Sequence, residues 1–219
     1  MAVSLGVVVI LLTSHRKVLL IGDSIMQQAG PAATGDLSRE GYQAQVQAYF
    51  GTGLLDTRFD WLGKMRQLVD QYRPDIVVVE FVGNYGGFGT RPGISEMSPQ
   101  FYAAWATAAQ QATDILTSRH AQVYWVLGPA MGKTALQARA TALGRIYLGL
   151  QAPASPARHP LFVDEVKPFT DAQGQYIAWT VVGDGPPVPL RLPDGLHLAP
   201  PAGTQRFADA ITATLPAAR

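Results

Sequence analysis

Short, nearly continuous apolar runs recur along the chain, and stretches with helical spacing separate them. The first clear run is KVLLIG at residues 17–22, which ends in glycine. Strands buried on both faces of a sheet have such continuous apolar sequences, whereas a half-exposed strand alternates apolar and polar residues. Runs of the first kind predict strands at residues 75–83, 122–128 and 161–163, and an alternating pattern predicts another at residues 43–50. The sequence therefore predicts five strands.

Amphipathic helices are predicted between these strands. In residues 61–73, apolar side chains recur at helical spacing along one face, and Pro74 follows the last of them. Similar patterns predict helices at residues 101–118, 134–150 and about 203–214. Strands that alternate with helices of this length form a parallel sheet with helices on both faces. We therefore expect an α/β three-layer sandwich built on a five-stranded parallel sheet.

The composition narrows the function classes. The chain has 219 residues, which suits one domain, and we assign residues 17–219 to it. Seventeen basic and sixteen acidic residues leave a net charge of +1, which excludes a chain-wide basic field, and we expect no nucleic-acid partner. The lack of cysteine excludes disulfide frameworks, thiolate zinc sites and cysteine nucleophiles. The four histidines lack metal-ligand spacing, so we predict neither a metal nor a cofactor. No pattern indicates an oligomeric state.

The N-terminal residues 1–16 contain a second kind of apolar segment. Residues 2–12 are nearly all apolar, but about 20 such residues are needed to span a bilayer. The basic residues follow this segment, whereas in a signal peptide they precede it. Two interpretations stay open. A shortened signal or anchor would give a secreted or membrane-anchored protein that associates with the membrane through residues 2–12, whereas an apolar tail or extra strand packed on the domain would be compatible with the cytoplasm.

Polar side chains follow the ends of the predicted strands, where ligands bind in open parallel sheets. Ser24 follows the first strand, Gly53 follows the second and Asn84 follows the third. Asp194 and His197 precede the last helix, at a spacing that lets the carboxylate reach the imidazole. Serine acyl chemistry needs a nucleophile, a base with an orienting acid, and oxyanion donors. The residues at these strand ends supply that set.

The residues at these strand ends match, in order, the short sequence blocks that characterise the SGNH, or GDSL-type, hydrolases. The chain resembles that family over residues from about 17 to 214. Gly22-Asp23-Ser24-Ile25 matches the nucleophile block, with Ile for the usual Leu, and Asp194-Gly195-Leu196-His197 matches the last block. Gly53, with Gly51 as the alternative, matches the glycine block, and Asn84 matches the asparagine block. The family usually has Gly-x-Asn-Asp there, whereas here Asn follows Gly directly and Tyr comes next.

The resemblance implies a flavodoxin-like fold and an ester hydrolase without a cofactor. It implies a triad of Ser24, His197 and Asp194 and an oxyanion hole of Ser24, Gly53 and Asn84. Such an enzyme would remove small acyl groups, such as acetyl, from esters of a small molecule or a glycan. A looser resemblance to envelope-associated members, in segments such as Gly174-Gln175-Tyr176, suggests a cell-envelope glycan. Tyr85 and Arg191 are then candidate substrate-binding residues, with loop packing and surface solvation as their alternatives.

Other functions stay open beside the esterase. An O-acyltransferase would use the same triad and pass the acyl group to a sugar hydroxyl. A silent binding module would keep the fold to hold a glycan. Residues 128–134 look like a phosphate loop, but that motif needs four residues between Gly and Gly-Lys-Thr and three are present. Glu80 inside a strand and Asp23 beside the nucleophile are interpreted as structural groups.

Overall fold

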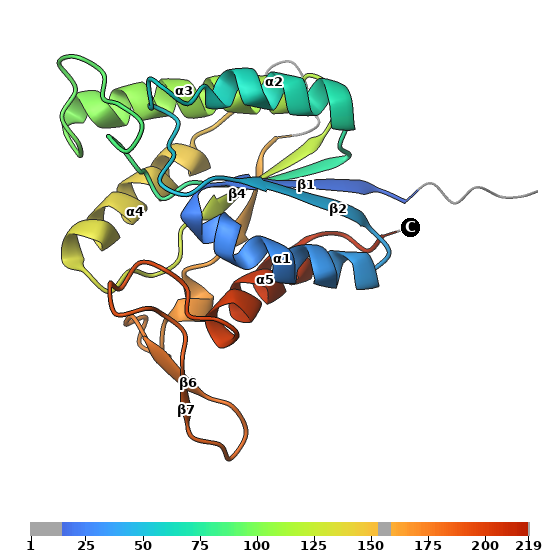
Figure 1. Ribbon diagram of the computed structural model, residues 1–219, viewed down its shortest axis with the longest axis vertical. Helices are drawn as coiled ribbons and strands as arrows, with labels where there is room; N and C mark the ends of the chain where they lie inside the picture. The colour runs from blue at the N-terminus through green and yellow to red at the C-terminus, as the bar shows by residue number, and fades with distance from the viewer. Residues whose placement is uncertain (1–14, 153–158, 219) are drawn as a thin grey trace, which may run out of the picture.

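The computed structural model describes residues 15–152 and 159–218. Five parallel strands form the central sheet in the order β2-β1-β3-β4-β5 (Figure 1). These strands are β1 (Lys17–Gly22), β2 (Gln43–Ala48), β3 (Ile76–Glu80), β4 (Gln122–Leu127) and β5 (Leu161–Asp164). The helices between and after them are α1 (Ser24–Arg39), α2 (Trp61–Tyr72), α3 (Pro99–Thr117), α4 (Thr134–Leu148) and α5 (Ala202–Thr214).

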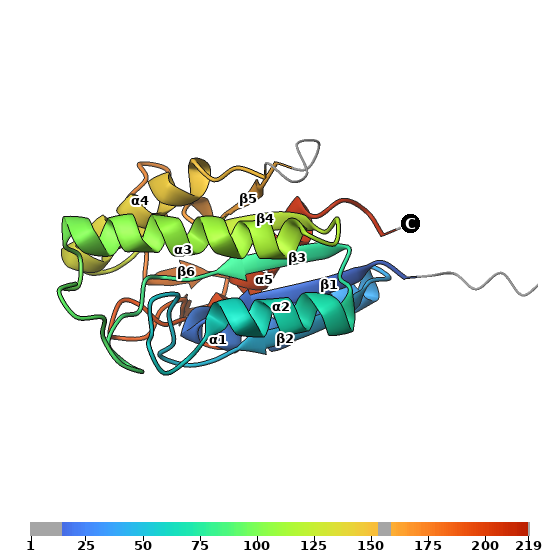
Figure 2. The same ribbon diagram turned by 90° about the horizontal axis from the view of Figure 1, so that it is seen from above.

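Helices cover both faces of this sheet. The helices α1 and α5 pack together on one face, and α2 and α3 pack together on the other (Figures 1 and 2). Alternate side chains of β1 enter the two cores: Val18 and Leu20 pack toward α1 and α5, and Leu19 and Ile21 pack with α2 and α3. Because successive side chains of a strand point to opposite faces, burial on both faces requires the continuous apolar run seen in the sequence. The predicted three-layer α/β sandwich is confirmed.

The strand register brings the expected loops to one edge of the sheet. Gly22, the last residue of β1, lies opposite Ala48 of β2 and Glu80 of β3. The three strands therefore end at the same level, and the segments that follow them leave the sheet side by side. Ser24, Gly53 and Asn84 all lie in or just after these segments.

The segment 165–193 contains more structure than its sequence predicts. It forms a short 3₁₀ helix, η2 (Lys167–Phe169), and an antiparallel hairpin of β6 (Trp179–Val181) and β7 (Pro187–Pro189). The hairpin projects from the body of the molecule (Figure 1). Proline is disfavoured in strands except at edges, and both ends of β7 are proline, so the sequence pattern does not predict a strand here.

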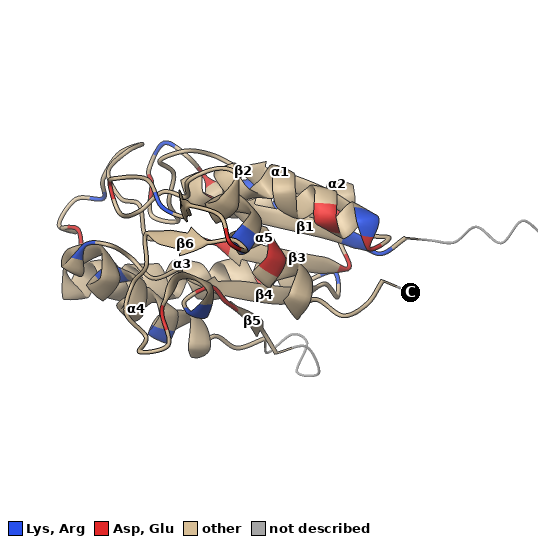
Figure 3. Ribbon diagram, turned by 90° about the horizontal axis from the view of Figure 1, so that it is seen from below, with Lys and Arg blue, Asp and Glu red and all other residues tan. Residues whose placement is uncertain are grey.

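The apolar segment 2–12 lies outside the described residues. Within the described part of the chain, no helix has the length and apolar character needed to cross a bilayer. Basic and acidic positions are interspersed along the elements seen in Figure 3.

Candidate active site

Ser24 lies in a tight turn between β1 and α1. It is the first residue of α1, and Asp23 caps that helix by accepting a hydrogen bond from the N–H of Ile25 at 3.1 Å. Gly22 permits the turn, because a Cβ at this position would lie 2.4 Å from the Cβ of Met26 and 2.7 Å from the backbone oxygen of Glu80. The close approach of strand and helix thus fixes the Ser24 side chain at the carboxyl edge of the sheet, near a helix N-terminus.

His197 approaches Ser24 from the opposite end of the chain. Its Nε2 lies 3.0 Å from Ser24 Oγ, across 173 positions of sequence. Its Nδ1 lies 2.6 Å from Asp194 Oδ2. These distances connect Ser24, His197 and Asp194 in one hydrogen-bonded chain, which is the arrangement that general-base activation of a serine requires.

Asp194 also organises the loop that carries His197. Its Oδ1 accepts hydrogen bonds from the N–H groups of Leu196 at 2.8 Å and His197 at 2.9 Å. Partial burial acts to raise the pKa of Asp194, but the hydrogen bonds from the His197 side chain and from the two backbone N–H groups outweigh it and lower the pKa to about 2. The carboxylate is therefore ionised at neutral pH and can stabilise an imidazolium at His197.

Phe50 forms one wall of this site, and the sequence patterns did not single it out as a site residue. Its ring stacks on the imidazole of His197, with 5.6 Å between centroids and 13° between planes. The Phe50 side chain is 64% exposed, which is unusual for a large apolar residue. Its place just after β2 was the only available signal, because the sequence cannot show that the His197 loop returns to this strand.

Gly53 and Asn84 are brought together beside the site. A Cβ on Gly53 would lie 2.0 Å from the backbone oxygen of Asn84, so only glycine fits there. The Gly53 N–H donates to Asp56 Oδ2 at 2.6 Å, and Asn84 Nδ2 donates to the Thr52 oxygen at 3.3 Å. Gly53 and Asn84 thus each have a protein acceptor, and the oxyanion role of Ser24, Gly53 and Asn84 stays a prediction. Asp56 is a buried carboxyl group that the sequence analysis did not single out.

Two carboxyl groups are buried beneath the nucleophile turn. Asp23 accepts the N–H of Val82 at 2.9 Å in addition to that of Ile25, and Glu80 accepts the N–H of Met26 at 3.1 Å. Burial raises the pKa of Asp23 to about 6. Burial, followed by the charge of Asp23, raises the pKa of Glu80 well above its usual range. These contacts agree with the structural interpretation of both groups, since each carboxyl ties α1 to the neighbouring strand.

Tyr85 makes its contacts within its own loop. Its hydroxyl accepts the N–H of Arg91 at 2.8 Å and lies 3.2 Å from the backbone oxygen of Ile94, and its ring packs edge-on against Phe101. These contacts favour a role in shaping the loop between β3 and α3. A contact of Tyr85 with substrate stays untested.

Arg191 lies behind the loop 192–197, which carries Asp194 and His197 and is called the catalytic loop below. The Arg191 side chain is only 3% exposed. Its guanidinium donates at 2.5 Å to the backbone oxygens of Leu196 and Ala130 and stacks over Phe169 at 4.5 Å. Burial lowers the pKa of Arg191 to about 10, so it stays charged at neutral pH. The alternative of surface solvation is wrong, because the side chain is buried, and its contacts favour support of the His197 loop. A contact of Arg191 with substrate stays untested.

The remaining chemical motifs do not form a second centre in the described part of the chain. No group of three or more His, Asp or Glu side chains gathers there in a way that could hold a metal ion. The segment 128–134 is a turn between β4 and α4, and the N–H of Gly132 donates to the Gly195 oxygen at 2.8 Å. This turn therefore packs against the catalytic loop.

Comparisons with known proteins agree with this geometry at the level of the fold. A GDSL-like lipase from Bacteroides thetaiotaomicron superposes with a TM-score of 0.59 and 15% identity, over 90% of this chain and 86% of its own. A putative lipolytic protein of the G-D-S-L family from Desulfitobacterium hafniense superposes with a TM-score of 0.62 and 14% identity, over 91% of this chain and 99% of its own. An acetyl xylan esterase superposes with a TM-score of 0.56 and 16% identity, over 91% of this chain and 100% of its own. None of the curated protein sequences compared matches the chain.

At these identities the likeness is one of fold. A family model described as "Protein of unknown function (DUF459)" matches residues 17–214, nearly the whole described chain. The chain therefore belongs to the DUF459 family, and its fold is that of the GDSL-type, or SGNH, hydrolases.

Proposed function

We propose that this protein is a serine ester hydrolase that removes small acyl groups, such as acetyl, from O-acyl esters. The observation that carries the proposal is the contact of Ser24 Oγ with His197 Nε2 at 3.0 Å, with Asp194 on the far side of the imidazole at 2.6 Å. A serine hydroxyl is a weak nucleophile until an adjacent base takes its proton, and this arrangement provides that base. The shared fold with GDSL-type lipases and esterases supports the same conclusion.

The reaction proceeds in two halves. His197 Nε2 takes the hydroxyl proton as Ser24 Oγ bonds to the ester carbonyl carbon, and the tetrahedral oxyanion accepts hydrogen bonds from nearby N–H groups. The intermediate collapses, the carbon–alkoxide bond breaks, and His197 returns the proton to the leaving alcohol. In the second half, His197 takes a proton from a water molecule as the oxygen of that water attacks the carbonyl carbon of the acyl-enzyme. The carboxylic acid leaves, and Ser24 regains its proton.

Asp194 contributes to both halves without changing its own protonation. Because its pKa is about 2, it stays negative while His197 becomes a cation in each half-reaction. Its hydrogen bond to Nδ1 also holds the tautomer in which Nε2 is the acceptor. Phe50 covers one face of the same ring and limits the directions from which water reaches it.

Covalent labelling with a fluorophosphonate tests the proposal. The full-length protein should be labelled, and peptide mass spectrometry should place the label on Ser24. We expect Ser24→Ala to abolish labelling and His197→Ala to slow it by about 10²–10⁴-fold, as for loss of a general base. Ser38→Ala, which removes an exposed serine at the other end of α1, is the matched control and should label normally. Folded protein that stays unlabelled, or a label on another serine, would refute the proposal.

A further inference from the structure

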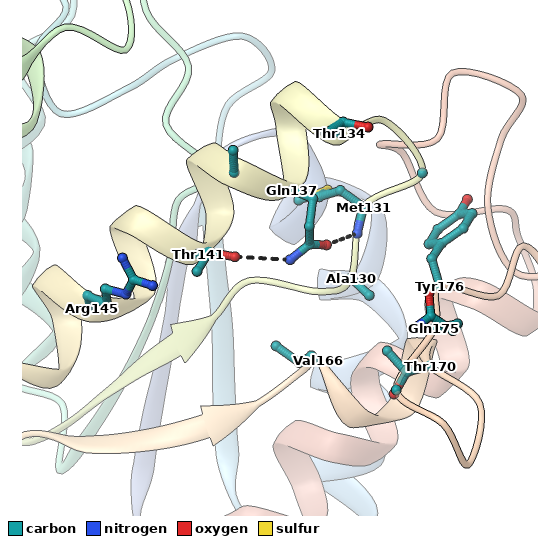
Figure 4. A pocket seen from close by; sticks show the side chains of 13 residues that line it. Ala130, Met131, Thr134, Gln137, Thr141, Arg145, Val166, Thr170, Gln175 and Tyr176 are labelled. Carbon is teal, nitrogen blue, oxygen red and sulfur yellow. Dashed lines mark hydrogen bonds between the residues drawn. The ribbon is translucent and has the colours of Figure 1, made fainter.

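Two cavities lie side by side next to the catalytic loop. The first, of about 610 Å³, opens between α4 and the segment 166–176 (Figure 4). The second, of about 650 Å³, lies between the loop 192–195 and the β6–β7 hairpin. Gly132 and Tyr176 line both cavities and lie close together, so they form the boundary that the two cavities share. We call the pair the lateral groove. Each half has the size of an ordinary ligand site.

The second half of the lateral groove adjoins the loop that carries His197, although neither Ser24 nor His197 lines it. Asp194 and Gly195 do line this half. The turn 128–134 forms the wall between the halves, and it is fixed to the catalytic loop by the hydrogen bond from Gly132 to Gly195. A molecule bound at Ser24 that is long enough to pass Asp194 would enter this groove. The segment that resembled a phosphate loop in the sequence therefore has a place beside the ester site.

The first half of the groove is lined by neutral hydrogen-bonding groups. Gln137 and Thr141 come from α4, and Thr170 and Gln175 face them from the other side (Figure 4). Gln137 is held in place, because it accepts the N–H of Met131 at 2.8 Å and donates to Thr141 Oγ1 at 3.2 Å. Hydroxyl and amide groups of this kind donate and accept, as sugar hydroxyls do.

The second half of the groove presents an exposed aromatic ring. Trp179 is 59% exposed on β6, and Lys133 and Leu192 lie along the same cavity. The neighbouring Thr180 accepts a hydrogen bond from Arg206 at 2.9 Å, which holds the hairpin against α5 and keeps Trp179 on the groove side. An exposed tryptophan in a cavity is suited to a ligand with both apolar faces and polar edges.

The charges in the groove argue against other ligands. A phosphate site would gather free cations. Lys133 and Arg191 line the second half, but the Arg191 guanidinium already donates to the backbone oxygens of Leu196 and Ala130, and Arg145 lines the first half. A lipid chain would need an apolar lining, whereas the first half is rich in threonine and glutamine. A sugar chain matches both halves, since its ring faces stack on aromatic side chains and its hydroxyls bind amides and hydroxyls.

We infer that the lateral groove binds an oligosaccharide whose acyl ester is held at Ser24, with Trp179 and Tyr176 as the stacking residues. This inference rests on the proposed function and adds the class of alcohol to it. The substrate is then an acylated glycan chain, and the groove selects it by length.

Tryptophan fluorescence provides a direct binding test. The chain has four tryptophans, and Trp61, Trp105 and Trp125 are at most 1% exposed, so acrylamide quenching reports mainly on Trp179. The Ser24→Ala protein should be titrated with chemically O-acetylated xylo-oligosaccharides and chito-oligosaccharides, from monosaccharide to hexasaccharide. Longer members of at least one series should protect the fluorescence from quenching, whereas the monosaccharides should not.

Variants on β6 then assign the effect to the groove. In the Ser24→Ala background, Trp179→Ala should weaken oligosaccharide binding by about tenfold in calorimetry, and Trp179→Tyr should restore part of it. Val181→Ala is the matched control, because Val181 is 58% exposed on the same strand but does not line the cavity. In the enzyme with intact Ser24, Trp179→Ala should lower kcat/KM for the acetylated hexasaccharide more than for the acetylated monosaccharide.

The outcomes separate this inference from the proposed function. If Ser24 is labelled but neither sugar series binds, the inference is wrong and the esterase proposal stands. If Val181→Ala weakens binding as much as Trp179→Ala, the groove assignment is wrong. If sugars protect Trp179 but Ser24 is never labelled, the groove binds glycans and the esterase proposal fails.

Discussion

Asn84 is the only asparagine in the chain, and the fold places it against Gly53 at the edge of the sheet. Its amide donates to Thr52 over 3.3 Å, a long hydrogen bond that is weak compared with one of ordinary length. Hydrogen bonds at a catalytic site are often long before substrate binds and tighten in the complex. The amide can therefore turn to a developing oxyanion at little cost.

The first prediction concerns this amide. Asn84→Ala should lower kcat for p-nitrophenyl acetate by about 10²–10³-fold, because one oxyanion donor is lost, while KM changes little. Gln173→Ala, which removes an exposed amide from the segment 165–193, should leave both constants unchanged. Steady-state kinetics measures both variants. A kcat within a factor of about two of the unaltered enzyme would remove Asn84 from the oxyanion hole.

The buried pair of Asp23 and Glu80 gives a prediction about pH. The pKa of Glu80 in the folded protein is raised well above its ordinary value of 4.5 by burial and by Asp23. Its contribution to stability is therefore fully present below pH 4.5 and is lost as the pH rises toward the folded-state pKa. Glutamine cannot ionise and can still accept the N–H of Met26. Glu80→Gln should therefore gain stability relative to the unaltered protein as the pH rises, by at most about 1.4 kcal/mol per pH unit.

Urea denaturation across the pH range measures this difference. Glu40→Gln, at the exposed C-terminal end of α1, controls for the loss of one acidic residue and should show a small, flat difference. A difference between Glu80→Gln and the parent that does not change from about pH 4 to about pH 8 would show that Glu80 ionises freely in the folded state.

At the scale of elements, the sequence predicted those whose side chains are buried in a regular pattern. The strands at residues 17–22 and 122–127 and the helices that begin near residues 61 and 134 lie within one or two residues of their expected limits. The expected strand at residues 43–50 ends at Ala48, because the chain turns there and leaves Phe50 exposed over His197. The β6–β7 hairpin was missed because its residues are exposed and rich in proline and so carry no apolar alternation.

The loop that carries His197 depends on a buried cation, which gives a prediction at this scale. Arg191→Met should leave the backbone oxygens of Leu196 and Ala130 without their donor and should destabilise the protein by about 2–4 kcal/mol. It should also lower kcat more than it raises KM, since His197 loses its support. Arg191→Lys keeps the charge and should recover part of both losses.

Urea denaturation measures the loss of stability, steady-state kinetics with p-nitrophenyl acetate measures kcat and KM, and the fluorophosphonate labelling rate reports on the reactivity of Ser24. Arg66→Met, at an exposed position on α2, is the control for replacing arginine at the surface. An Arg191→Met protein of unchanged stability and labelling rate would show that Asp194 alone holds the catalytic loop.

At the scale of the whole molecule, the contact of Ser24 with His197 could be predicted, because the topology allows it. Parallel strands end at one edge, so residues after β1 and residues before α5 can meet even though they are far apart in sequence. The contacts among loops could not be predicted in the same way. The stacking of Phe50 on His197, the capture of the Gly53 N–H by Asp56, and the lateral groove depend on distances that no sequence spacing encodes.

The last prediction separates the domain from the apolar residues that precede it. In the described part of the chain, both cores begin at Val18, and His15 Nδ1 lies 2.9 Å from the Gly41 oxygen. A chain that begins at His15 should therefore fold with the same thermal midpoint and label at Ser24 at the same rate. If residues 2–12 are a membrane anchor, the full chain should co-sediment with phosphatidylcholine vesicles and the shortened chain should stay in solution. A shortened chain that unfolds at a much lower temperature would instead favour the alternative in which the apolar segment packs on the domain, because only burial against the cores would make those residues contribute to stability.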